Sequence, residues 1–390
     1  MNQKKKLLVT ASTFPRWEGD TEPRFILDLV SHMTNEFDVT VLAPAAPGTK
    51  NRESLEGVGV IRYHYFPIHK WETLCYPGAI IPRIKERKVR AFLVPFLFIS
   101  LFFHLIILLP RFDIVHAHWI IPQGIVQSFF KKPYIVTGHG GDISSMNSGI
   151  LRKLKERCLS NAKMITVVSK YKQQELERLY PGYQNEIISM GVDTTLFEKK
   201  TNYVQNYFGQ NNKNVILYVG RLAEIKGIYY LIKAMSYVKD AILIIVGEGP
   251  ERQKLEYLAK ESQNEIYFWG SKTHKELKKI YASADVFVVP SITDDRGAQE
   301  GLPTVIMEAM ASGLPVVASN TGGIPQLIKD EISGLLCEEK NVEQLANSIN
   351  KLLSDERLRQ RIIDMAYEAI KEYDYKTIAE RYKRIINQYL

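Results

Sequence analysis

Two glutamates, Glu300 and Glu308, lie eight residues apart around a Gly-Leu-Pro turn. The stretch 304–311 holds no helix breaker, Pro303 suits a first helical turn and Gly313 suits a helix end, so a helix is predicted here. The free amides of a helix N-terminus bind anions. A carboxylate just before that terminus can accept hydrogen bonds from hydroxyl groups, and a second one lies one to two turns inside the helix. A ligand that joins a sugar to a ribose through a diphosphate would satisfy all three features.

This predicted anion site has a plain alternative, which is a solvated helix whose glutamates merely favour its N-terminal end. Glutamate is common, so the spacing alone does not decide between the two. The amides that would face the anion are those of Gly301, Leu302 and Thr304. Two further segments favour the ligand site.

Two cations, Arg221 and Lys226, follow an apolar strand in the segment Tyr218-Val-Gly-Arg-Leu-Ala-Glu-Ile-Lys-Gly. Gly220 permits a tight exit from that strand, so both cations are expected on the loop between the strand and the next helix. Two fixed cations can neutralise a leaving diphosphate and take the place of a metal ion. The alternative is ordinary salt bridging at the surface.

A histidine, His139, stands between glycines in the segment Thr-Gly-His-Gly-Gly-Asp at the end of another predicted strand. Flanking glycines let the backbone approach a ligand closely. A second pair, His116 and His118, alternates along a strand and shares one face of it, so a metal site has to be considered. No third ligand stands at a recognisable spacing, and we expect this pair to line the core or a cleft. The carboxylates Asp294 and Asp295 could also suggest a metal, but such a loop pair is usually solvated.

Parallel strands are needed to position these residues, and short apolar runs do alternate with amphipathic stretches along the whole chain. That alternation is typical of repeated βα units and predicts an α/β fold with parallel sheets. In the first half, strands are predicted over Lys6–Ala11, Asp38–Leu42, Ile114–His118, Tyr134–Thr137 and Met164–Val168. In the second half, they are predicted over Val215–Val219, Ala241–Val246, Ile266–Phe268, Val286–Val289 and Val316–Ala318.

The length of the chain, 390 residues, exceeds what one core supports and predicts two domains. The polar, Asn-rich run 202–214 marks the boundary, so that residues 1–200 form the first domain and residues 201–374 the second. Both are predicted to be doubly wound, with a ligand at the carboxyl ends of the strands in a cleft between them. The last predicted helix, 375–390, follows the second domain and is expected to pack back on the first.

The formal charge of +8 is concentrated in the first half. Residues 1–200 carry 27 Lys+Arg against 18 Asp+Glu, and residues 201–390 carry 24 against 25. The first half is therefore expected to meet an acidic partner. The chain shows no nucleic-acid motif, which leaves membrane phosphates, an anionic substrate or a generic effect on solubility. Its three cysteines lie far apart without metal or disulfide spacing, as in a reducing cytoplasm, and the short apolar run after Lys6 predicts a first strand rather than a signal peptide.

The run 91–110 is nearly all apolar and follows five basic residues, Arg83, Lys85, Arg87, Lys88 and Arg90. Its length is enough for a transmembrane helix. Strands on both sides of the run are predicted to share one sheet, which cannot straddle a bilayer, and Pro95 and His104 also argue against a span. We therefore expect a helix that dips into an anionic membrane surface through residues 83–110. An ordinary buried helix is the second interpretation and a true span the third.

The most specific pattern in the chain is the segment from Glu300 to Glu308 together with Arg221 and Lys226. Weaker motifs are Phe14-Pro-Arg-Trp-Glu-Gly-Asp, His-Ala-His-Trp119, Thr-Gly-His-Gly, Val-Ser169, Gly191-Val-Asp, Gly-Arg-Leu, Gly247-Glu-Gly and Trp269-Gly. Together, over nearly the whole chain, they resemble the retaining sugar-nucleotide glycosyltransferases of the GT-B fold, specifically the large fourth family. The resemblance implies two Rossmann-like domains that face each other across a cleft.

The resemblance also implies roles for the residues. Glu300 and the amides after it would hold the donor sugar, Glu308 the ribose, and the two cations the diphosphate, while His139 would lie beside the transferred sugar. The implied catalytic residues are His139, Glu300, Arg221 and Lys226. The implied donor-binding residues are Gly19, Arg221, Lys226, Gly249, Gly301, Leu302, Pro303, Thr304 and Glu308.

We therefore expect a hexosyltransferase-type enzyme that moves a sugar from a UDP- or GDP-linked donor to a lipid-linked or cell-envelope polysaccharide acceptor. Retention by front-face transfer is implied by the resemblance, and no cofactor or metal is expected because Arg221 and Lys226 make a metal unnecessary. The expected location is the cytoplasm, peripherally on the inner face of the cell membrane. The alternatives are a sugar-nucleotide epimerase of the same fold and a catalytically silent glycan-binding or scaffold protein.

Overall fold

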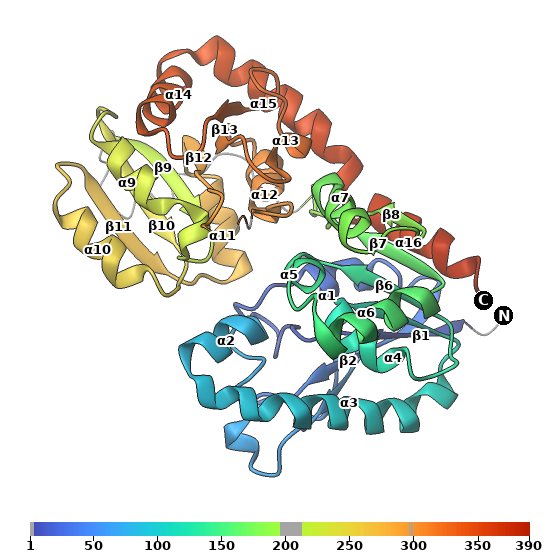
Figure 1. Cartoon of the computed structure of the whole chain (residues 1–390). Helices are drawn as coiled ribbons and strands as arrows, with labels where there is room; N and C mark the ends of the chain where they lie inside the picture. Colours follow the sequence, from blue (N-terminus) through green and yellow to red (C-terminus); the bar gives the residue numbers. More distant parts are fainter. Residues whose placement is uncertain (1–3, 196–212, 296, 298) are drawn as a thin grey trace. The chain divides into compact units, whose positions relative to one another are not determined.

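The computed structural model describes residues 4–195, 213–295, 297 and 299–390 (Figure 1). The chain forms two compact units, and each has its own sheet with helices packed against it. The first unit comprises the residues up to Gly191 together with Tyr375–Leu390, and the second comprises Val192–Asp374. The Asn-rich run predicted to mark the boundary lies, up to residue 212, outside the described residues.

The boundary between the units falls earlier than the predicted one at residues 200 and 201. The N–H of Val192 donates to the carbonyl oxygen of Tyr373 over 2.9 Å, and Val192 forms a parallel bridge with Asp374. The hydroxyl of Thr194 donates to the Asp374 carboxylate over 2.5 Å. These bonds attach residues 192–194 to the end of the second unit. Composition, on which the predicted boundary rested, carries no information about such bonds.

The first unit is built on an eight-stranded sheet in the order β3-β4-β2-β1-β5-β6-β7-β8. Only β3 and β4 pair antiparallel among its described strands. The strands are β1 Lys5–Thr10, β2 Phe37–Pro44, β3 Arg52–Leu55, β4 Val58–Tyr63, β5 Ile114–His118, β6 Tyr134–Gly138, β7 Met164–Val167 and β8 Asn185–Ile187. Every residue of β5 and β6 is buried, as expected for parallel strands covered on both faces.

Helices cover the two faces of this sheet (Figure 1). On one face α1 and α16 share a core with Leu7 and Val9, and on the other α3, α4, α6 and α7 share a core with Leu8 and Val115. The helices of this unit are α1 Phe25–Ser31, α2 Ile80–Glu86, α3 Val94–Leu108, α4 Ile125–Gln127, α5 Gly141–Ser144, α6 Gly149–Asn161, α7 Lys170–Leu179 and α16 Tyr375–Asn387. The last helix of the chain is thus part of the first unit.

The second unit has a six-stranded sheet in the order β11-β10-β9-β12-β13-β14, and all of these neighbours are parallel. The strands are β9 Asn214–Val219, β10 Ala241–Val246, β11 Glu265–Gly270, β12 Val286–Val289, β13 Val316–Ser319 and β14 Leu335–Cys337. The helices are α9 Ile228–Met235, α10 Arg252–Lys260, α11 His274–Tyr281, α12 Thr304–Ala311, α13 Ile324–Leu327, α14 Val342–Ser354 and α15 Glu356–Ile370. The predicted α/β fold with two doubly wound sheets is confirmed.

All ten predicted strands are present, and their ends differ from the predicted ones by at most two residues. Four strands were not predicted, namely β3, β4, β8 and β14. Three of these, β3, β8 and β14, are short strands of three or four residues at sheet edges, and β4 carries Gly59 and Arg62 among its apolar residues. Sequence periodicity is weakest in such strands.

The apolar run 91–110 forms most of the helical segment Lys88–Arg111, which is long and apolar enough to cross a membrane by length and composition. Within it Leu97, Leu101 and Leu105 are at most 1% exposed and pack in a core of the first unit. A helix whose leucine face belongs to the core under a sheet is not arranged as a membrane span. The opposite face of α3 is not covered in this way.

Candidate functional site

The order of the second sheet reverses between β9 and β12. The chain passes from β9 outward to β10 and β11, and from β12 outward the other way to β13 and β14. In open parallel sheets, ligands bind outside the carboxyl ends of the strands at such a reversal. The loop after β9 carries Arg221 and Lys226, and the loop after β12 leads to Glu300 and α12. The predicted residues of the second unit therefore gather at one edge of one sheet.

The loop that carries Arg221 rests on the loop after β10. The N–H of Leu222 donates to the carbonyl oxygen of Glu248 over 3.0 Å. A side chain at Gly249 would place its Cβ 2.2 Å from the carbonyl oxygen of Leu222, so only glycine permits this approach. Gly249 thus supports the exposed Arg221 through the backbone of the loop.

Lys226 ends a short helical turn that is fixed against the loop after β12. The N–H of Ile292 donates to the carbonyl oxygen of Ile225 over 2.8 Å. Gly227 has a φ of +65°, and a Cβ there would lie 1.9 Å from the carbonyl oxygen of Pro290. Glycine is therefore required after Lys226, and the backbone at the lysine has little freedom.

Lys226 and Glu300 form an ion pair between Nζ and Oε1. Their side chains are only 22% and 13% exposed, so the pair is more shielded from solvent than a surface salt bridge. The carbonyl oxygen of Glu300 accepts from the N–H of Gly323 over 3.1 Å, which anchors this segment to the loop after β13. Burial, and then the Glu300 carboxylate, raise the pKa of Tyr218 in β9. The structure thus brings together a cation and a carboxylate that are far apart in the sequence.

Helix α12 begins at Thr304, and Pro303 occupies the position before it. The prediction that Pro303 lies in the first helical turn is wrong, because its ψ of 109° is extended rather than helical. Within the described residues, the amides of Gly301, Leu302 and Thr304 have no hydrogen-bond acceptor. They are donors of the kind that an anion at a helix N-terminus requires.

Glu308 lies in the second turn of α12 and accepts a hydrogen bond from the hydroxyl of Tyr281 over 3.0 Å. Tyr281 is buried, and burial, followed by the Glu308 carboxylate, raises the pKa of Tyr281 well above its usual value. The phenol therefore stays neutral at physiological pH and holds Glu308 in place. Sequence reasoning missed Tyr281, since no local pattern links two residues on different helices.

In the first unit, His139 directly follows β6, and its Nε2 lies 2.9 Å from Nδ1 of His118 at the end of β5. The rings of Trp119 and Phe25 lie 4.7 Å and 5.4 Å from the ring of His139. Trp119 has a φ of +74°, a conformation that costs a bulky residue about 1–3 kcal/mol. His139 is therefore held by aromatic rings and one hydrogen bond, and it stays partly exposed.

Asp142 shapes the loop that carries His139. One of its carboxylate oxygens accepts from the N–H groups of His139 and Gly140 over 3.1 Å and 2.8 Å, and the other accepts from Ile120 over 2.8 Å. Burial raises the pKa of Asp142, although these N–H groups oppose the shift. The buried carboxyl group ties the loop after β6 to the loop after β5. Its position three residues after the histidine was a usable signal, because Asp commonly accepts from nearby loop amides.

The histidines of this cluster are neutral at physiological pH. Burial lowers the pKa of His116 and His139 to about 3, and it lowers the pKa of His118 well below its usual value. Nε2 of His118 has no hydrogen-bond partner among the described residues. A buried N–H without an acceptor is less tolerable than a bare ring nitrogen, so His118 carries its proton on Nδ1 and donates it to His139. His139 then carries its own proton on Nδ1, and that N–H is the group it can offer to a ligand.

A buried polar layer continues from these histidines to the last helix. Nε2 of His116 lies 2.7 Å from Oγ1 of Thr137, which lies 2.6 Å from Oγ1 of Thr166. The hydroxyl of Tyr382 in α16 lies 3.3 Å from Oγ1 of Thr137. The prediction that His116 and His118 line the core or a cleft is met, since both are fully buried.

No group of three His, Cys, Asp or Glu side chains in the described part of the chain is arranged to hold a metal ion. His116 and His118 do share one face of β5, with ring centroids 4.2 Å apart. Their nitrogens, however, face Thr137 and His139 rather than a common point. The carboxylate pair 294–295 lies in the loop after β12, where residue 295 is exposed.

Gly19 lies in the loop after β1 of the first unit, with a φ of +78° and open space where a Cβ would stand. The turn around it is closed by Arg16, whose guanidinium donates to both carboxylate oxygens of Asp20 over 2.9 Å and 2.7 Å. The exposed ring of Trp17 lies 4.4 Å from that guanidinium. Gly19 and His139 are residues of the first unit, whereas the other predicted site residues belong to the second.

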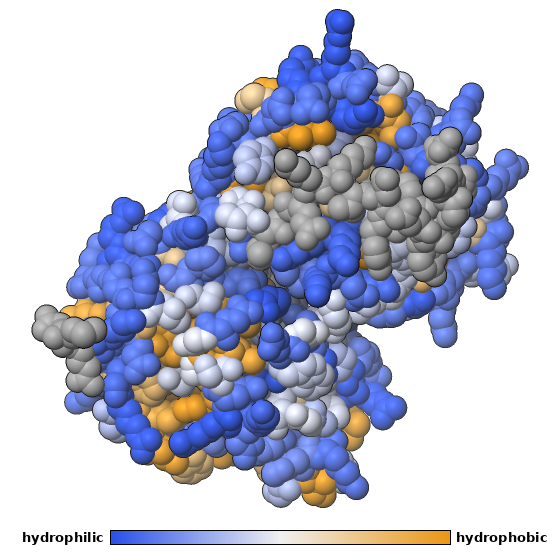
Figure 2. Space-filling model, turned by 180° about the vertical axis from the view of Figure 1, so that it is seen from behind, coloured by the Kyte–Doolittle hydropathy of each residue, from blue (hydrophilic) through white to orange (hydrophobic). Residues whose placement is uncertain are grey.

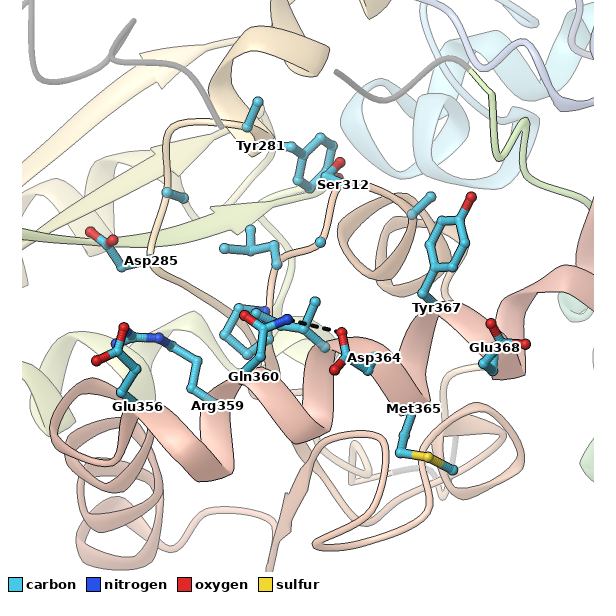
Figure 3. Close-up of a pocket in the computed structure, with 17 residues that line it drawn as sticks. Tyr281, Asp285, Ser312, Glu356, Arg359, Gln360, Asp364, Met365, Tyr367 and Glu368 are labelled. Atoms are coloured by element: carbon cyan, nitrogen blue, oxygen red, sulfur yellow. Dashed lines mark hydrogen bonds and ion pairs between the residues drawn. The ribbon is translucent and has the colours of Figure 1, made fainter. Parts of the chain in front are cut away.

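A large hollow of about 910 Å³ lies elsewhere on the second unit (Figure 3). Its lining includes Asp285, Ser312, Arg359 and Tyr367, from the segments before β12 and β13 and from α15. The residues before a strand lie at its amino end, so this hollow is at the edge of the sheet opposite to Lys226. Ligands of open parallel sheets bind at the carboxyl edge, and we do not assign the hollow to the site.

Two family models match the chain, Glycosyltransferase Family 4 over residues 23–196 and Glycosyl transferases group 1 over residues 199–369. An uncharacterized glycosyltransferase of Methanocaldococcus jannaschii is 30% identical over 302 residues, which cover 72% of this chain and 75% of the relative. The chain therefore belongs to the group 1 glycosyltransferases, which confirms the resemblance found in the sequence.

Two further relatives have more specific names. A putative teichuronic acid biosynthesis glycosyltransferase of Bacillus subtilis is 27% identical over 66% of this chain and 66% of its own length. A GDP-mannose-dependent phosphatidylinositol monomannoside mannosyltransferase of Mycobacterium tuberculosis is 28% identical over 59% of this chain and 62% of its own length.

Solved structures resemble the chain over nearly its whole length. Sucrose-phosphate synthase from Thermosynechococcus elongatus has a TM-score of 0.80 at 22% identity, over 99% of both chains. HepE from Anabaena, solved in complex with UDP and glucose, has a TM-score of 0.73 at 19% identity, over 98% of this chain and 100% of HepE. At this level of identity the likeness concerns the fold, and it confirms the predicted GT-B fold.

Proposed function

We propose that the protein is a retaining, metal-independent glycosyltransferase that transfers a sugar from a UDP- or GDP-linked donor to a lipid-linked or cell-envelope polysaccharide acceptor. The observation that supports this most is the ion pair of Lys226 and Glu300 at the reversal of the second sheet, next to the unpaired amides that precede and begin α12. At the carboxyl edge of one sheet, the cation can bind a diphosphate, and the carboxylate and the free N–H groups can hydrogen-bond to a sugar.

In this proposal the bound donor separates Lys226 from Glu300. The diphosphate brings negative charge to Lys226 and Arg221, and Lys226 exchanges the carboxylate of Glu300 for phosphate oxygens. Glu300 then accepts hydrogen bonds from hydroxyls of the donor sugar. The amides of Gly301, Leu302 and Thr304 donate hydrogen bonds to oxygens of the same sugar. Glu308, held by its tyrosine partner, accepts from the ribose hydroxyls.

Transfer then depends on charge that the protein supplies. As the bond between the anomeric carbon and the phosphate oxygen breaks, Lys226 and Arg221 stabilise the charge on the leaving diphosphate. The new bond to the acceptor oxygen forms on the same face of the sugar, and the acceptor proton passes to the leaving phosphate. His139 donates its Nδ1–H to an oxygen of the transferred sugar. No step in this scheme requires a metal ion.

Support for the substrate classes comes from relatives. HepE was solved in complex with UDP and glucose, and the mycobacterial relative is named for a GDP-mannose donor and a phosphatidylinositol monomannoside acceptor. The Bacillus subtilis relative is named for teichuronic acid biosynthesis. These names point to a nucleotide-linked donor and to an acceptor that is a lipid-linked sugar or an envelope polysaccharide.

A thermal-shift series with UDP- and GDP-sugars, each with and without chelator, tests the donor site. The expected result is a raised Tm with one donor in chelator, because a ligand at about a hundred times its Kd stabilises a fold by about 2.7 kcal/mol. Incubation of that donor with membranes should then release nucleotide and label a membrane glycan. Product formed without any acceptor would favour an epimerase, and binding without nucleotide release would favour a silent glycan-binding protein. If no sugar nucleotide shifts the Tm, the donor-site assignment is wrong.

A further inference from the structure

Helix α3 has two apolar faces with different surroundings. Its leucine face is buried in the core under the first sheet. The other face carries Phe92 just before the helix, then Ile99, Phe103 and Ile107, which are 63%, 54%, 58% and 62% exposed. These positions follow one another at intervals of seven, four and four residues, so they form one stripe along the segment.

The exposed apolar surface is concentrated in this part of the molecule. Of the twenty large apolar side chains that are exposed among the described residues, nine lie between residues 68 and 107. Hydrophobic surface, orange in Figure 2, is visible on the first unit toward the lower edge of that view. Contiguous apolar patches on a folded protein mark contact sites rather than chance exposure.

Aromatic rings extend the stripe at its start. Trp71, which is 53% exposed, stacks on Phe66 with ring centroids 5.8 Å apart. Phe66 contacts Phe96 edge-on at 5.0 Å, and Phe96 lies 5.2 Å from Phe92. An exposed tryptophan beside an apolar helix is typical of residues that lie at the headgroup level of a bilayer.

The charges next to the stripe are mostly positive. Residues 66–111 contain seven Lys+Arg and two Asp+Glu. Of the five basic residues singled out in the sequence, Arg83 and Arg90 turn inward and pair with Glu86 over 2.6 Å and 2.9 Å. The exposed basic side chains are those of Lys85, Arg87 and Lys88, directly before the stripe.

We propose that this face of the first unit docks on an anionic phospholipid surface, with the α3 stripe in the apolar region and Lys85, Arg87 and Lys88 at the lipid phosphates. The positive charge beside the stripe favours an anionic bilayer over a second copy of the chain as the partner of this face. A second copy of the chain would present the same positive cluster beside its own stripe and no cluster of acidic side chains to pair with it, whereas an anionic bilayer complements both the charge and the apolar stripe. The 15 residues of α3 span about 22 Å, and with its leucines in the core the helix lies along the surface rather than through it.

Flotation with vesicles of phosphatidylcholine alone or mixed with phosphatidylglycerol measures the docking. The whole protein should float with the mixed vesicles at low salt and remain behind with phosphatidylcholine alone. Substitution of Lys85, Arg87 and Lys88 by Gln should weaken partitioning about a hundredfold, the effect of three basic residues near an anionic surface. The double variant Phe103→Ser, Ile107→Ser should also lose binding. Wild-type protein that stays unbound at low salt would overturn the proposal, as would a triple variant that binds like wild type.

Matched control variants show whether binding depends on this surface or on the charge and apolar side chains of the protein in general. Lys239, Lys260 and Lys275 are exposed lysines of the second unit, and their substitution by Gln should leave flotation unchanged. Tyr257→Ser removes a side chain that is 69% exposed on that unit and should also have no effect. Sugar-nucleotide binding should persist in every docking variant, because all the proposed donor-site residues except Gly19 and His139 lie in the second unit and no docking variant changes any of them. A failure of docking is therefore distinguishable from a failure of the proposed function.

Labelling distinguishes docking from a span. The three native cysteines are buried, so cysteines introduced by Lys88→Cys and Arg111→Cys are the reactive ones. Protein bound to the outside of mixed vesicles should react at both positions with an impermeant maleimide, since both ends of the segment stay on one side. Protection of one end only, together with resistance to carbonate extraction, would show a span and overturn the surface-docked arrangement.

Discussion

His118 donates to His139 over 2.9 Å across two neighbouring strands of the first unit. The direction of this bond follows from the lack of a partner for the other nitrogen of His118 in the described structure. The bond decides which nitrogen of His139 carries the proton, and in the proposed mechanism that nitrogen faces the transferred sugar. In that mechanism, the buried His118 acts on the reaction through its neighbour His139, without contact to a ligand of its own.

Replacement of His118 should therefore lower kcat without weakening donor binding. His118→Leu removes the hydrogen bond that selects the tautomer of His139, and we expect kcat to fall roughly tenfold or more, as when a catalytic imidazole takes the wrong tautomer. His118→Asn keeps an N–H donor near the position of Nδ1 and should retain most of the activity. Steady-state kinetics and donor titration of the two variants decide the matter. Equal kcat values for the leucine variant and the wild type would contradict the positioning role.

The stability of the fold should fall as the pH is lowered below about 6.5, the usual histidine pKa. Burial lowers the pKa of His116 and His139 to about 3, so between these values the unfolded chain binds protons that the folded chain does not. Stability then rises with pH across this window, by up to about 1.4 kcal/mol per pH unit for each such histidine. Denaturant unfolding at several pH values measures the slope. His118→Asn removes one buried histidine and should show a smaller slope than the wild type, and an unchanged slope would contradict this account.

Loss of either donor-site cation should reduce turnover strongly. We expect Lys226→Ala or Arg221→Ala to lower kcat/KM roughly a hundredfold or more, the scale of one lost preorganised electrostatic contact. Lys239→Ala, an exposed lysine of the same unit, is the matched control and should be near wild type. Thermal unfolding should accompany the kinetics, because removal of Lys226 also leaves the partly buried Glu300 without its partner. Wild-type kinetics in a folded Lys226 variant would rule out the diphosphate assignment.

Excess chelator should leave the activity unchanged, since the proposed mechanism uses protein cations where other enzymes use a divalent metal. The measurement is the transfer rate in chelator before and after addition of magnesium or manganese. Activity that disappears in chelator and returns with either metal would contradict the proposal. It would also revive a role for the carboxylate pair at residues 294 and 295.

Two glycines with nearly the same backbone conformation offer a clean test of the packing behind Lys226. Gly227 and Gly313 have φ values of +65° and +69°, but a Cβ would clash with the carbonyl oxygen of Pro290 only at Gly227, while at Gly313 it meets an ordinary contact with Ile363. Gly313→Ala should cost about 1 kcal/mol of backbone strain, and Gly227→Ala should cost clearly more. Urea unfolding of the two variants compares them directly. Equal costs would mean that the loop moves away from an added methyl group.

The sequence predicted the interior of the fold better than its edges. Apolar runs such as Ala241–Val246 identify strands because a strand covered on both faces excludes polar residues. The polar edge strand Arg52–Leu55 lacks that constraint and was missed. The same limit applies to α3, because the hydropathy of a helix does not show which of its faces a sheet will cover.

The sequence predicted which residues belong to the candidate site but not which of them contact one another. Glu300 and Lys226 were assigned to the ligand from local motifs, yet their mutual ion pair depends on the order of β9 and β12 in the sheet. The three histidines were recognised as two separate features, because the bond between His118 and His139 joins neighbouring strands that are far apart in the chain. Tyr281, which holds Glu308, carried no local signal at all.

The place of α16 has a consequence for how the chain is made. The core of the first unit includes Ile378, Tyr382 and Ile386, which leave the ribosome after the whole of the second unit. Residues Val192–Asp374 are complete before them, so the second unit can finish folding during synthesis while the first still lacks part of its interior. A nascent or truncated chain that ends before Tyr375 would thus present the open α1 face of the first sheet to chaperones, although the donor-site residues of the second unit are all present.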